Sequence, residues 1–568
     1  MPPKETHEAA YGRREFVRRL SYGSLSVVGA SGLASLTGCS SSNRQPDRPN
    51  IVLILADDMG YSDIGCFGGE IRTPNLDRLA GDGLRFTHFH NVARCCPSRA
   101  SLLTGLYPHQ AGVGAMMNDR GLPGYRGDLN RNCVTIAEVM RTAGYRTYGC
   151  GKWHVTRFIE PDGSKHNWPR QRGFDRYFGT ITGAGSFFEP MTLTLDNDPV
   201  EALPDDYYHT DGISDHAVSF IRDHGEEDAR VPFFLYTAFT APHWPLHARD
   251  TDIERSQGRF DSGWDRLRQE RYERMVSIGI IDPRWRLSFR DASVPPWDEA
   301  EHRAWQLRRI EVYAAQVEAM DRGIGRIVSE LGRQGILDNT LILFLSDNGG
   351  CHEELNTQGW YDYILRGKDK ICREFTLDGK PITVGNFPEI MPGPYDTYQS
   401  YGRPWANLSN TPFRLYKTFA HTGGVATPLI AHWPAGIPAR GELRNHSGHL
   451  IDLMSTCVNV SGAAYPRTLE GHAITPMEGL SLVPAFSNLP IEREAIFFEH
   501  IRNRAVLAPP WKLVARGGKG LWELYDMESD RTETQNLAVQ YPNQVERLAS
   551  MWQQWAERVK VLPWEKDG

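Results

Sequence analysis

The chain has 568 residues, of which 40% are hydrophobic and 23% charged, and its formal net charge is −7. This length is enough for one large, well-buried domain with a smaller one beside it, and the composition is typical of a soluble globular protein. The mild negative charge excludes nucleic acid as an expected partner, because nucleic-acid binding requires clustered positive charge.

Residues 1–38 are predicted to be a removable targeting segment rather than part of the fold. Residues 13–17 (RREFV) resemble a twin-arginine export motif, and the weakly apolar run behind them holds too many small residues for a good membrane-spanning helix. Residues 36–39 (LTGC) resemble a bacterial lipobox. We therefore expect export, lipidation of Cys39, and anchoring to a membrane in the periplasm or at the cell surface. The alternative is a plain signal peptide that is cut elsewhere.

The main domain is predicted to span residues 50–490, after a polar linker at 39–49. Four apolar runs are typical of strands buried on both faces of a parallel sheet: residues 50–56, 145–149, 233–237 and 341–345. Helical patterns at 134–143 and 301–333 lie between them. Strands that alternate with helices predict an α/β fold, with a large mixed and mostly parallel sheet flanked by helices.

A smaller C-terminal subdomain is predicted at residues 491–568. Short apolar segments near 495–500, 505–506, 511–515 and 522–525 are separated by turn-forming residues, which is typical of an antiparallel sheet. A polar helix from residue 543 to about 559 closes the chain. The nine cysteines are spread too sparsely to form a disulfide framework.

Polar side chains follow each of the four predicted strands of the main domain, at the edge where α/β proteins place their functional groups. The first strand is followed by Asp57 and Asp58, and the fourth by Asp347 and Asn348. Their oxygen-only donor set suits Ca²⁺ or Mg²⁺ rather than zinc. Taken singly, each pair is equally well explained as a turn; two such pairs in one domain favour a metal site.

Four segments carry further chemistry: residues 95–105 (CCPSRASLLTG), 151–154 (GKWH), 240–243 (TAPH) and 410–417 (NTPFRLYK). Arg99, Lys152 and Lys417 provide fixed positive charge for an anionic substrate, and His154 and His243 can transfer protons near neutral pH. A lone lysine is more often a surface residue, and a lone histidine can simply cap a loop. What favours a functional reading of these segments is their resemblance to the motifs of a known family.

Together these segments resemble the type I sulfatases, which are arylsulfatase-like enzymes of the alkaline phosphatase superfamily. The resemblance runs from about residue 50 to residue 563 and implies the alkaline-phosphatase-like fold and the hydrolysis of sulfate esters. It implies that Cys95 is converted to formylglycine by a maturation enzyme and attacks the sulfur as the hydrate. It also implies one ion, Ca²⁺ rather than Mg²⁺, held by the group at Cys95 and by Asp57, Asp58, Asp347 and Asn348.

The resemblance assigns roles to the remaining residues as well. Arg99 and Lys152 would position the nucleophile and stabilise the sulfuryl group, and Asp347 would help to deprotonate the attacking hydroxyl. His243 and Lys417 would assist the leaving alcohol. His154 would take the proton that allows the aldehyde to reform and sulfate to leave. The expected partner is a sulfated small molecule or glycan.

Three positions depart from this pattern or lie beside it. Thr422 stands where the family usually has Glu before a Gly pair, and His352 lies near the predicted metal turn. Altered contacts around the site, rather than lost activity, are expected from both. We expect Cys96 to be a small packed residue; a disulfide with Cys95 or a thiolate metal site is the less favoured alternative.

Two other functions stay open. A phosphonate monoester or phosphodiester hydrolase can use the same fold and nucleophile, because both substrates present a tetrahedral anion. A non-catalytic lipoprotein that binds sulfated glycan on an inactive fold would lack ligands or the nucleophile, and all ten expected positions are present. The sequence does not specify the natural substrate, the position of the sulfate, the oligomeric state, the membrane leaflet or the maturation enzyme.

Overall fold

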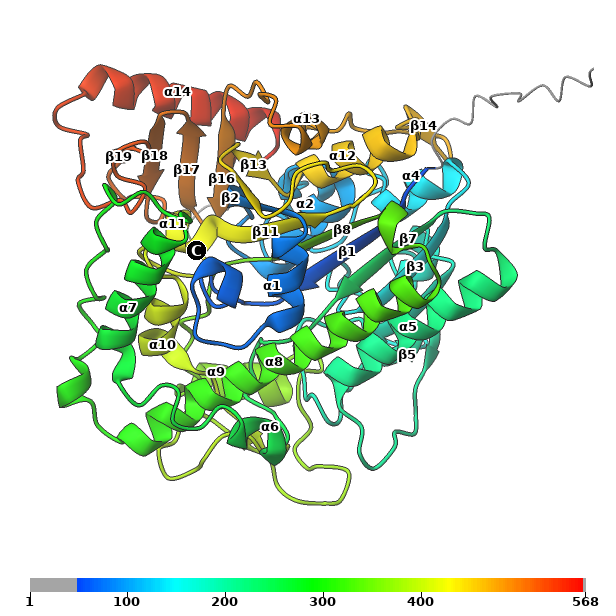
Figure 1. Ribbon diagram of the computed structural model, residues 1–568, viewed down its shortest axis with the longest axis horizontal. Helices are drawn as coiled ribbons and strands as arrows, with labels where there is room; N and C mark the ends of the chain where they lie inside the picture. Colours follow the sequence, from blue (N-terminus) through cyan, green and yellow to red (C-terminus); the bar gives the residue numbers. More distant parts are fainter. Residues whose placement is uncertain (1–47, 565–568) are drawn as a thin grey trace, which may run out of the picture. The chain divides into compact units, whose positions relative to one another are not determined.

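Strand β1 (Asn50–Ala56) lies in the interior of an eleven-stranded sheet, in the computed structural model that describes residues 48–564. The predicted targeting segment and Cys39 lie outside the described residues. Within the described part of the chain, no helix combines the length and hydropathy needed to cross a membrane. Figure 1 shows the sheet at the centre of the molecule with helices around it.

The central sheet is mixed and mostly parallel, as predicted. Besides β1, its strands are β2 (Leu84–His90), β3 (Arg146–Gly151), β4 (Arg176–Thr180), β5 (Leu193–Leu195), β6 (Asp198–Pro199), β7 (Phe233–Ala238), β8 (Thr340–Ser346), β11 (Ala426–His432), β12 (Glu442–Arg444) and β13 (Gly448–His449). Strands β8, β1, β7 and β3 are adjacent and parallel, whereas β11 runs antiparallel to both β8 and β2.

Strand β1 is buried on both faces because its side chains enter two different apolar clusters. Val52 and Ile54 pack in one cluster with residues of three helices, α1 (Pro74–Gly81), α5 (His209–Glu227) and α8 (Arg303–Arg333). Ile51 and Leu53 pack in the other with α2 (Cys95–Thr104), α4 (Ile136–Thr142) and α12 (Asp452–Ser461). This alternation explains why the strand reads as a continuous apolar run.

The main domain also contains shorter helices and two small sheets. The helices are α3 (Pro108–Ala111), α6 (Asp250–Glu254), α7 (Gly263–Ser277), α9 (Gln358–Arg366), α10 (Gly402–Ser409), α11 (Thr422–Val425) and α13 (Val483–Phe486). Two small sheets pair β9 (Thr383–Val384) with β10 (Thr397–Tyr398) and β14 (Thr468–Leu469) with β15 (His472–Ala473). Several of these elements surround the site described below.

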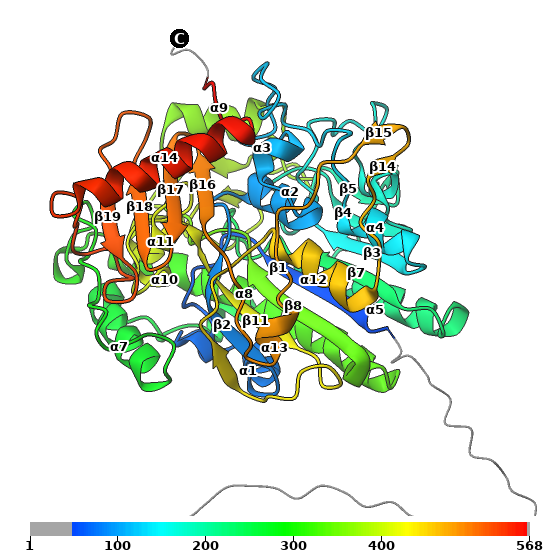
Figure 2. The same cartoon turned by 90° about the horizontal axis from the view of Figure 1, so that it is seen from above.

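The C-terminal region forms a four-stranded antiparallel sheet, which confirms the predicted fold class. Its strands are β16 (Ile496–His500), β17 (Asn503–Ala508), β18 (Trp511–Ala515) and β19 (Glu523–Asp526). Helix α14 (Pro542–Arg558) covers one face of this sheet, as Figure 2 shows, with Trp552 and Trp555 packed against it. The predicted domain boundary at residue 490 stays a prediction.

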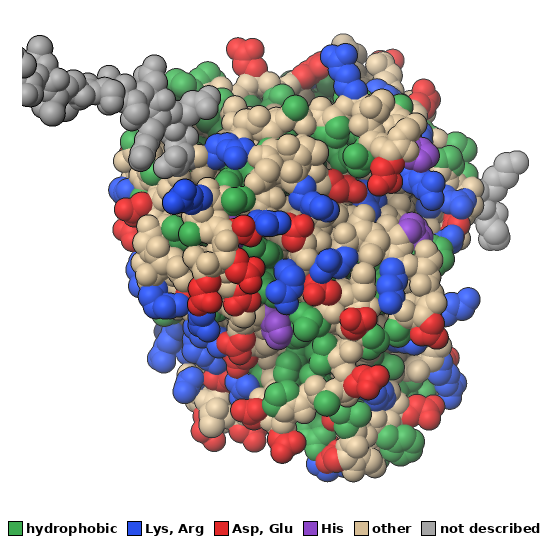
Figure 3. Space-filling model, turned by 90° about the vertical axis from the view of Figure 1, so that its right-hand side faces the viewer, with side chains coloured by type: hydrophobic (Ala, Val, Ile, Leu, Met, Phe, Trp, Pro, Cys, Tyr) green, Lys and Arg blue, Asp and Glu red, His purple; other side chains and the backbone are tan. Residues whose placement is uncertain are grey.

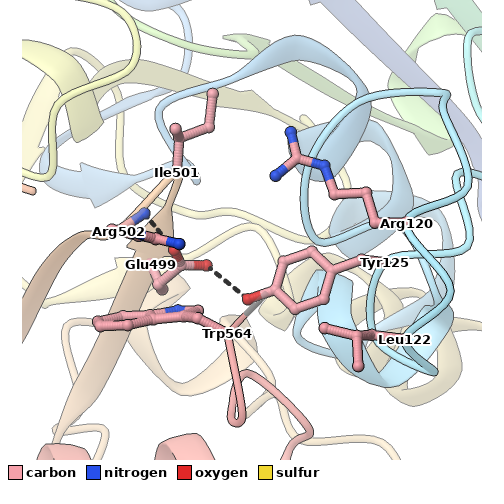
Figure 4. Close-up of a pocket in the computed structure, with 7 residues that line it drawn as sticks. All are labelled: Arg120, Leu122, Tyr125, Glu499, Ile501, Arg502 and Trp564. Carbon is pink, nitrogen blue, oxygen red and sulfur yellow. Dashed lines mark hydrogen bonds between the residues drawn. The ribbon is translucent and has the colours of Figure 1, made fainter. Parts of the chain in front are cut away.

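Both faces of the C-terminal sheet are covered: α14 packs on one face, and the other face packs on the main domain. Ile496 and Phe498 of β16 share an apolar cluster with Ala93 and Val425. A polar contact adds to this junction: the Tyr125 hydroxyl donates to Glu499 over 3.3 Å, and the two side chains point toward each other in Figure 4. The C-terminal sheet therefore lies against the segments just before residue 95 and just after residue 422.

Candidate active site

The four strand ends predicted to carry functional groups lie side by side. The order β8-β1-β7-β3 places Asp347, Asp57, His243 and Lys152 after neighbouring strands at one edge of the sheet. All four side chains are buried, with at most 5% of each residue exposed. A parallel arrangement is what brings these carboxyl-terminal ends together, because parallel strands all end at the same edge.

The acidic residues form one tight group. The Asn348 side-chain amide donates to Asp58 over 2.7 Å, and the Asp58 backbone N–H donates to Asp347 over 3.2 Å. Burial raises the pKa of Asp57 well above its ordinary value, and the neighbouring Asp347 raises it further. Such a group is electrostatically costly unless cations lie close by.

Three buried cations contact these carboxylates. The Lys152 ammonium lies 2.6 Å from Asp57, and the Arg99 guanidinium lies 2.8 Å from Asp347. Arg99 also donates to the Lys152 backbone carbonyl over 2.9 Å, which ties the two cation-bearing segments together. The Lys417 ammonium lies 2.8 Å from Asp58. The formal negative charge of the three aspartates therefore equals the formal positive charge of Lys152, Arg99 and Lys417.

Cys95 is the first residue of α2, at the positive end of the helix dipole, and only 2% of the residue is exposed. Its sulfur, the Cys96 sulfur and a His154 ring nitrogen all lie within 4.8 Å of one another. A hydrogen bond from the Cys96 thiol lowers the pKa of Cys95 well below its ordinary value, and the Lys152 charge lowers it further. The position favours a negatively charged, nucleophilic group.

Lys417 and His243 meet at Asp58. The His243 Nε2 atom lies 3.3 Å from the Asp58 carboxylate and 3.3 Å from the Lys417 ammonium. The other ring nitrogen, Nδ1, is hydrogen-bonded to the Trp244 carbonyl over 2.6 Å, which fixes the ring. Burial lowers the pKa of His243 to about 3, so this ring is neutral near neutral pH, and its charged neighbour is the Lys417 ammonium.

Strained backbone conformations gather around the same site. Asp58, His154, Ala93 and Thr418 all have positive φ, between 55° and 87°, although none is glycine. Such conformations cost about 1–3 kcal/mol each and persist where the surrounding structure requires them. Two of these residues are predicted site residues, Thr418 follows Lys417 directly, and Ala93 lies two positions before Cys95.

The oxygen donors fit a hard divalent cation. Asp57 Oδ1 and Asn348 Oδ1 are buried and have no hydrogen-bond partner among the residues that the structure describes. An oxygen without a partner in a buried acidic group is a position where a cation ligand is expected. The described residues also contain a cluster of Asp57, Asp58 and His243 whose ligand atoms lie within 4.8 Å of one another.

Thr422 and His352, the two positions singled out beside the expected family pattern, both make defined side-chain contacts. Thr422 donates from its hydroxyl to the Glu533 carboxylate over 2.8 Å, and its backbone N–H contacts both Glu533 oxygens at 3.1 Å. Lys512 pairs with the same carboxylate at 2.7 Å. A carboxylate from the C-terminal region therefore lies beside the position that lacks the expected Glu. The His352 ring stacks on Tyr416, with ring centroids 5.0 Å apart.

Glu353 is a site-adjacent residue that the sequence analysis missed. Its carboxylate accepts from Arg94 over 2.6 Å and from the Trp244 indole over 2.9 Å, and it lies 3.9 Å from Lys417. Burial acts to raise the pKa of Glu353, but the charges of Lys417 and Arg94 outweigh burial and hold it well below its ordinary value. No motif marked Glu353, because its partners come from three distant segments.

Comparison with known proteins gives the family. Residues 49–463 match the family model described as Sulfatase. The chain belongs to the sulfatase family. An arylsulfatase of Klebsiella aerogenes is 33% identical over 77% of this chain and 92% of its own, and an uncharacterised sulfatase of Schizosaccharomyces pombe is 32% identical over 90% and 94%.

The fold comparison agrees with the family. A crystal structure of Ps i-CgsB in complex with k-i-k-neocarrahexaose covers 90% of this chain and 93% of its own, with 24% identity and a TM-score of 0.62. The predicted family, fold class and enzyme class are therefore confirmed, and this sulfatase is a sulfuric ester hydrolase. All ten predicted site residues lie in one connected cluster of the sulfatase, whereas their individual roles stay predictions.

Proposed function

We propose that this sulfatase hydrolyses sulfate esters of aryl alcohols or carbohydrates, with formylglycine made from Cys95 as nucleophile and one bound Ca²⁺. The observation that carries the proposal is the placement of Cys95 at the start of α2 and within 4.8 Å of His154. The buried carboxylates and cations supply an electrostatic environment for an anionic ester.

The oxygen cluster supports the choice of ion. Asp57, Asp58, Asp347 and Asn348 would hold Ca²⁺, together with the group at residue 95. Hydrated formylglycine supplies a hydroxyl nucleophile, and Ca²⁺ supplies a Lewis acid and a template for the sulfate. Because the carboxylates and cations of the chain balance, a divalent ion gives the site the net positive charge that an anionic substrate requires.

The remaining residues divide into three tasks. Arg99 holds Asp347 and the Lys152 carbonyl, so it fixes the geometry on the nucleophile side. Lys417, with His243 held beside it, is placed to protonate the leaving oxygen. His154 lies beside residue 95 and would accept a proton from that side chain. Burial lowers the pKa of His154, which keeps the ring neutral and able to act as a base.

The nucleophile can be tested directly by mass spectrometry. Trypsin cuts after Arg94 and Arg99, so residue 95 is carried on a short peptide. Protein made in its native host should give this peptide with an aldehyde in place of the first thiol. A peptide that keeps two intact thiols in an active preparation would overturn the proposed nucleophile.

A rate comparison separates the sulfatase from the phosphonate or phosphodiester hydrolase. The family match and the arylsulfatase relative favour the sulfate ester. We expect a higher kcat/KM on 4-nitrophenyl sulfate than on bis-4-nitrophenyl phosphate. A phosphodiester rate that is greater by orders of magnitude would reject the proposed substrate class. A protein that carries formylglycine and binds sulfated sugars without hydrolysing any ester would support the non-catalytic alternative.

We also propose twin-arginine export and lipid anchoring at Cys39, which rest on the sequence motifs alone. Labelling of cells with a radioactive fatty acid should mark the wild-type protein. The Cys39→Ala variant should lose the label and appear in the soluble fraction after cell disruption. A Cys39→Ala variant that stays with the membrane would contradict the proposed anchor.

A further inference from the structure

A large cavity opens beside the catalytic cluster. Its volume is about 840 Å³, and its lining includes Arg94, Met116, Arg157, Trp360, Tyr363 and Lys368. Cavities of about 300–1,000 Å³ that combine apolar walls with a few polar groups are typical small-molecule sites. The surface view in Figure 3 shows acidic and basic side chains interspersed over one face of the molecule, so no patch of a single charge marks a binding site on the face drawn there.

The cavity lies next to the site: its lining holds none of the ten predicted site residues, but it includes residues adjacent to or in contact with their neighbours. Arg94 precedes Cys95 in the chain, and the Met116 sulfur lies 3.6 Å from the Cys96 sulfur. On the far wall, the Trp360 ring meets the Trp244 ring edge-on at 5.9 Å, and Trp244 follows His243. The cavity therefore borders both the nucleophile and the residues placed at the leaving oxygen, which is where the alcohol part of an ester must lie.

One wall of the cavity is aromatic. Trp360 and Tyr363 lie on α9 with ring centroids 5.8 Å apart, and Thr357 caps that helix by accepting from the Trp360 backbone N–H. The Tyr363 hydroxyl donates to Asp369 over 3.0 Å, which fixes that ring. Rigid aromatic faces beside a catalytic centre bind flat ligands by stacking at low entropic cost. The wall therefore suits a ring-shaped alcohol.

The cavity lining also carries an available positive charge, just after the end of α9. Lys368 is exposed in the cavity lining, and none of the residues 48–564 forms an ion pair with it. Both acidic residues of the lining are already engaged: Asp119 pairs with Arg157 at 2.9 Å and with Arg126 at 3.1 Å, and Asp369 accepts from Tyr363. Lys368 is thus free to meet an anion, whereas Arg157, in the same lining, shares its charge with Asp119.

We propose that this cavity binds the alcohol half of the substrate, and that this alcohol is a ring with a second anionic group that lies beside Lys368 and Arg157. The proposal rests on the proposed sulfatase function and names its substrate class. A carboxylate or a second sulfate on the ring has the required chemistry. The hydrolysis step itself is unchanged; the second anion contributes to binding and orientation.

A matched pair of esters tests the proposal. The substrates are 4-(sulfooxy)phenylacetate and its methyl ester, which differ in charge at a position insulated from the leaving oxygen by a methylene group. We expect wild-type protein to favour the anion by about two- to fivefold in kcat/KM, because the exposed Lys368 forms an ion pair with the second anion and strengthens its binding. Added salt should reduce the preference.

Variants of the cavity residues show which side chains cause the preference for the anionic ester. The Lys368→Gln and Arg157→Gln variants should each lower the preference, whereas Lys519→Gln, an exposed lysine on the turn after β18, should retain it. The Trp360→Ala variant should lower kcat/KM for both esters by about three- to tenfold while the preference stays.

The experiment distinguishes a failure of this inference from a failure of the proposed sulfatase function. Equal kcat/KM for both esters in wild type, or a preference that survives both charge variants, would overturn this inference while the sulfatase function stands. If a preparation whose residue 95 carries formylglycine hydrolyses neither ester nor 4-nitrophenyl sulfate, the proposed function itself fails.

Discussion

Asp58 is the residue at which the proposed metal ligands and the residues proposed to assist the leaving group meet. It accepts from Asn348 on one carboxylate oxygen and from Lys417 on the other, and His243 lies 3.3 Å from the second oxygen. Burial acts to raise the pKa of Asp58, but His243 and Lys417 lower it below its ordinary value. Asp58 raises the pKa of Lys417 in return, against the effect of burial, so this lysine stays protonated.

The first prediction concerns Lys417. If Lys417 protonates the leaving oxygen, Lys417→Met should lower kcat by about 10²–10⁴-fold for a poor leaving group such as 4-methylphenol. The loss should be much smaller for 2,4-dinitrophenol, which leaves without a proton. The measurement is kcat on the two aryl sulfates, with Lys519→Met as the control. An equal loss on both esters would show that Lys417 acts only through its contacts with the proposed metal ligands.

Many site residues could be predicted from the sequence because each follows an apolar strand or lies in a short motif. Asp57 and Asp347 are examples, since local pattern alone places them at strand ends. Glu353 and Glu533 could not be predicted, because their partners are distant in sequence and no local pattern marks them. The sequence also could not predict that Lys368 has no ion-pair partner among the described residues, because this depends on which carboxylates nearby are already paired.

Helix α11 shows how an element of the main domain depends on the C-terminal region. This short helix begins at Thr422, and its backbone contacts the turn after Asn348, because the Gly349 N–H donates to the Gly424 carbonyl over 3.1 Å. Glu533 and Lys512 form a buried pair against Thr422, and at most 2% of either residue is exposed. The carboxylate thereby links the C-terminal region, through α11, to the turn that follows the proposed metal ligand Asn348.

The second prediction concerns this buried pair. Glu533→Ala should lower the free energy of unfolding by about 3–5 kcal/mol, because it leaves the Lys512 charge buried and without its partner. The double variant Glu533→Met with Lys512→Met should recover much of that loss. Urea unfolding measures both. A single variant with the stability of wild type would contradict the role given to the pair.

The same pair predicts a dependence on pH. Burial acts to raise the pKa of Glu533, but the charges of Lys512 and His421 outweigh it, so the pKa is lowered in the folded protein. The stabilisation is therefore complete above the unfolded pKa of about 4.3 and is lost as the pH falls through the folded value. The difference in unfolding free energy between wild type and Glu533→Gln should shrink below about pH 4. A constant difference between pH 7 and pH 3 would contradict this assignment.

The strands that are continuous apolar runs could be predicted from the sequence, whereas strands that contain polar residues or proline could not. Strands β1, β7 and β8 are continuous apolar runs and lie within one or two residues of their predicted bounds. Strand β2 includes Arg85, His88 and His90, and β11 contains Pro428, so neither shows a clear strand pattern. The order of strands in the sheet is set by packing between distant segments, which no local pattern encodes.

The whole molecule joins its two sheets through shared contacts. An apolar cluster includes Ala93 and Val425 of the main domain together with strands of the C-terminal sheet. Glu499 of β16 adds a buried polar junction, since it accepts from Tyr125 and lies 2.7 Å from His109. Separating the two regions would expose both the apolar cluster and the Glu499 carboxylate.

The third prediction follows from these junctions. Thermal unfolding of the chain from residue 39 onward should give one calorimetric transition, because neither region retains its buried contacts without the other. Glu499→Gln should lower the midpoint of that single transition as a whole. Two transitions separated in temperature, with only the second moved by Glu499→Gln, would show that the sheets unfold independently.

The catalytic cluster draws on residues that the ribosome makes far apart in time. Asp57 is among the first of them, Lys417 is the last of the ten predicted site residues, and Glu533, which supports α11, lies near the end of the chain. All ten site residues are present only once residue 417 has been made, and the support from Glu533 only once residue 533 has been made. The growing polypeptide therefore cannot assemble the complete arrangement until most of its synthesis is over.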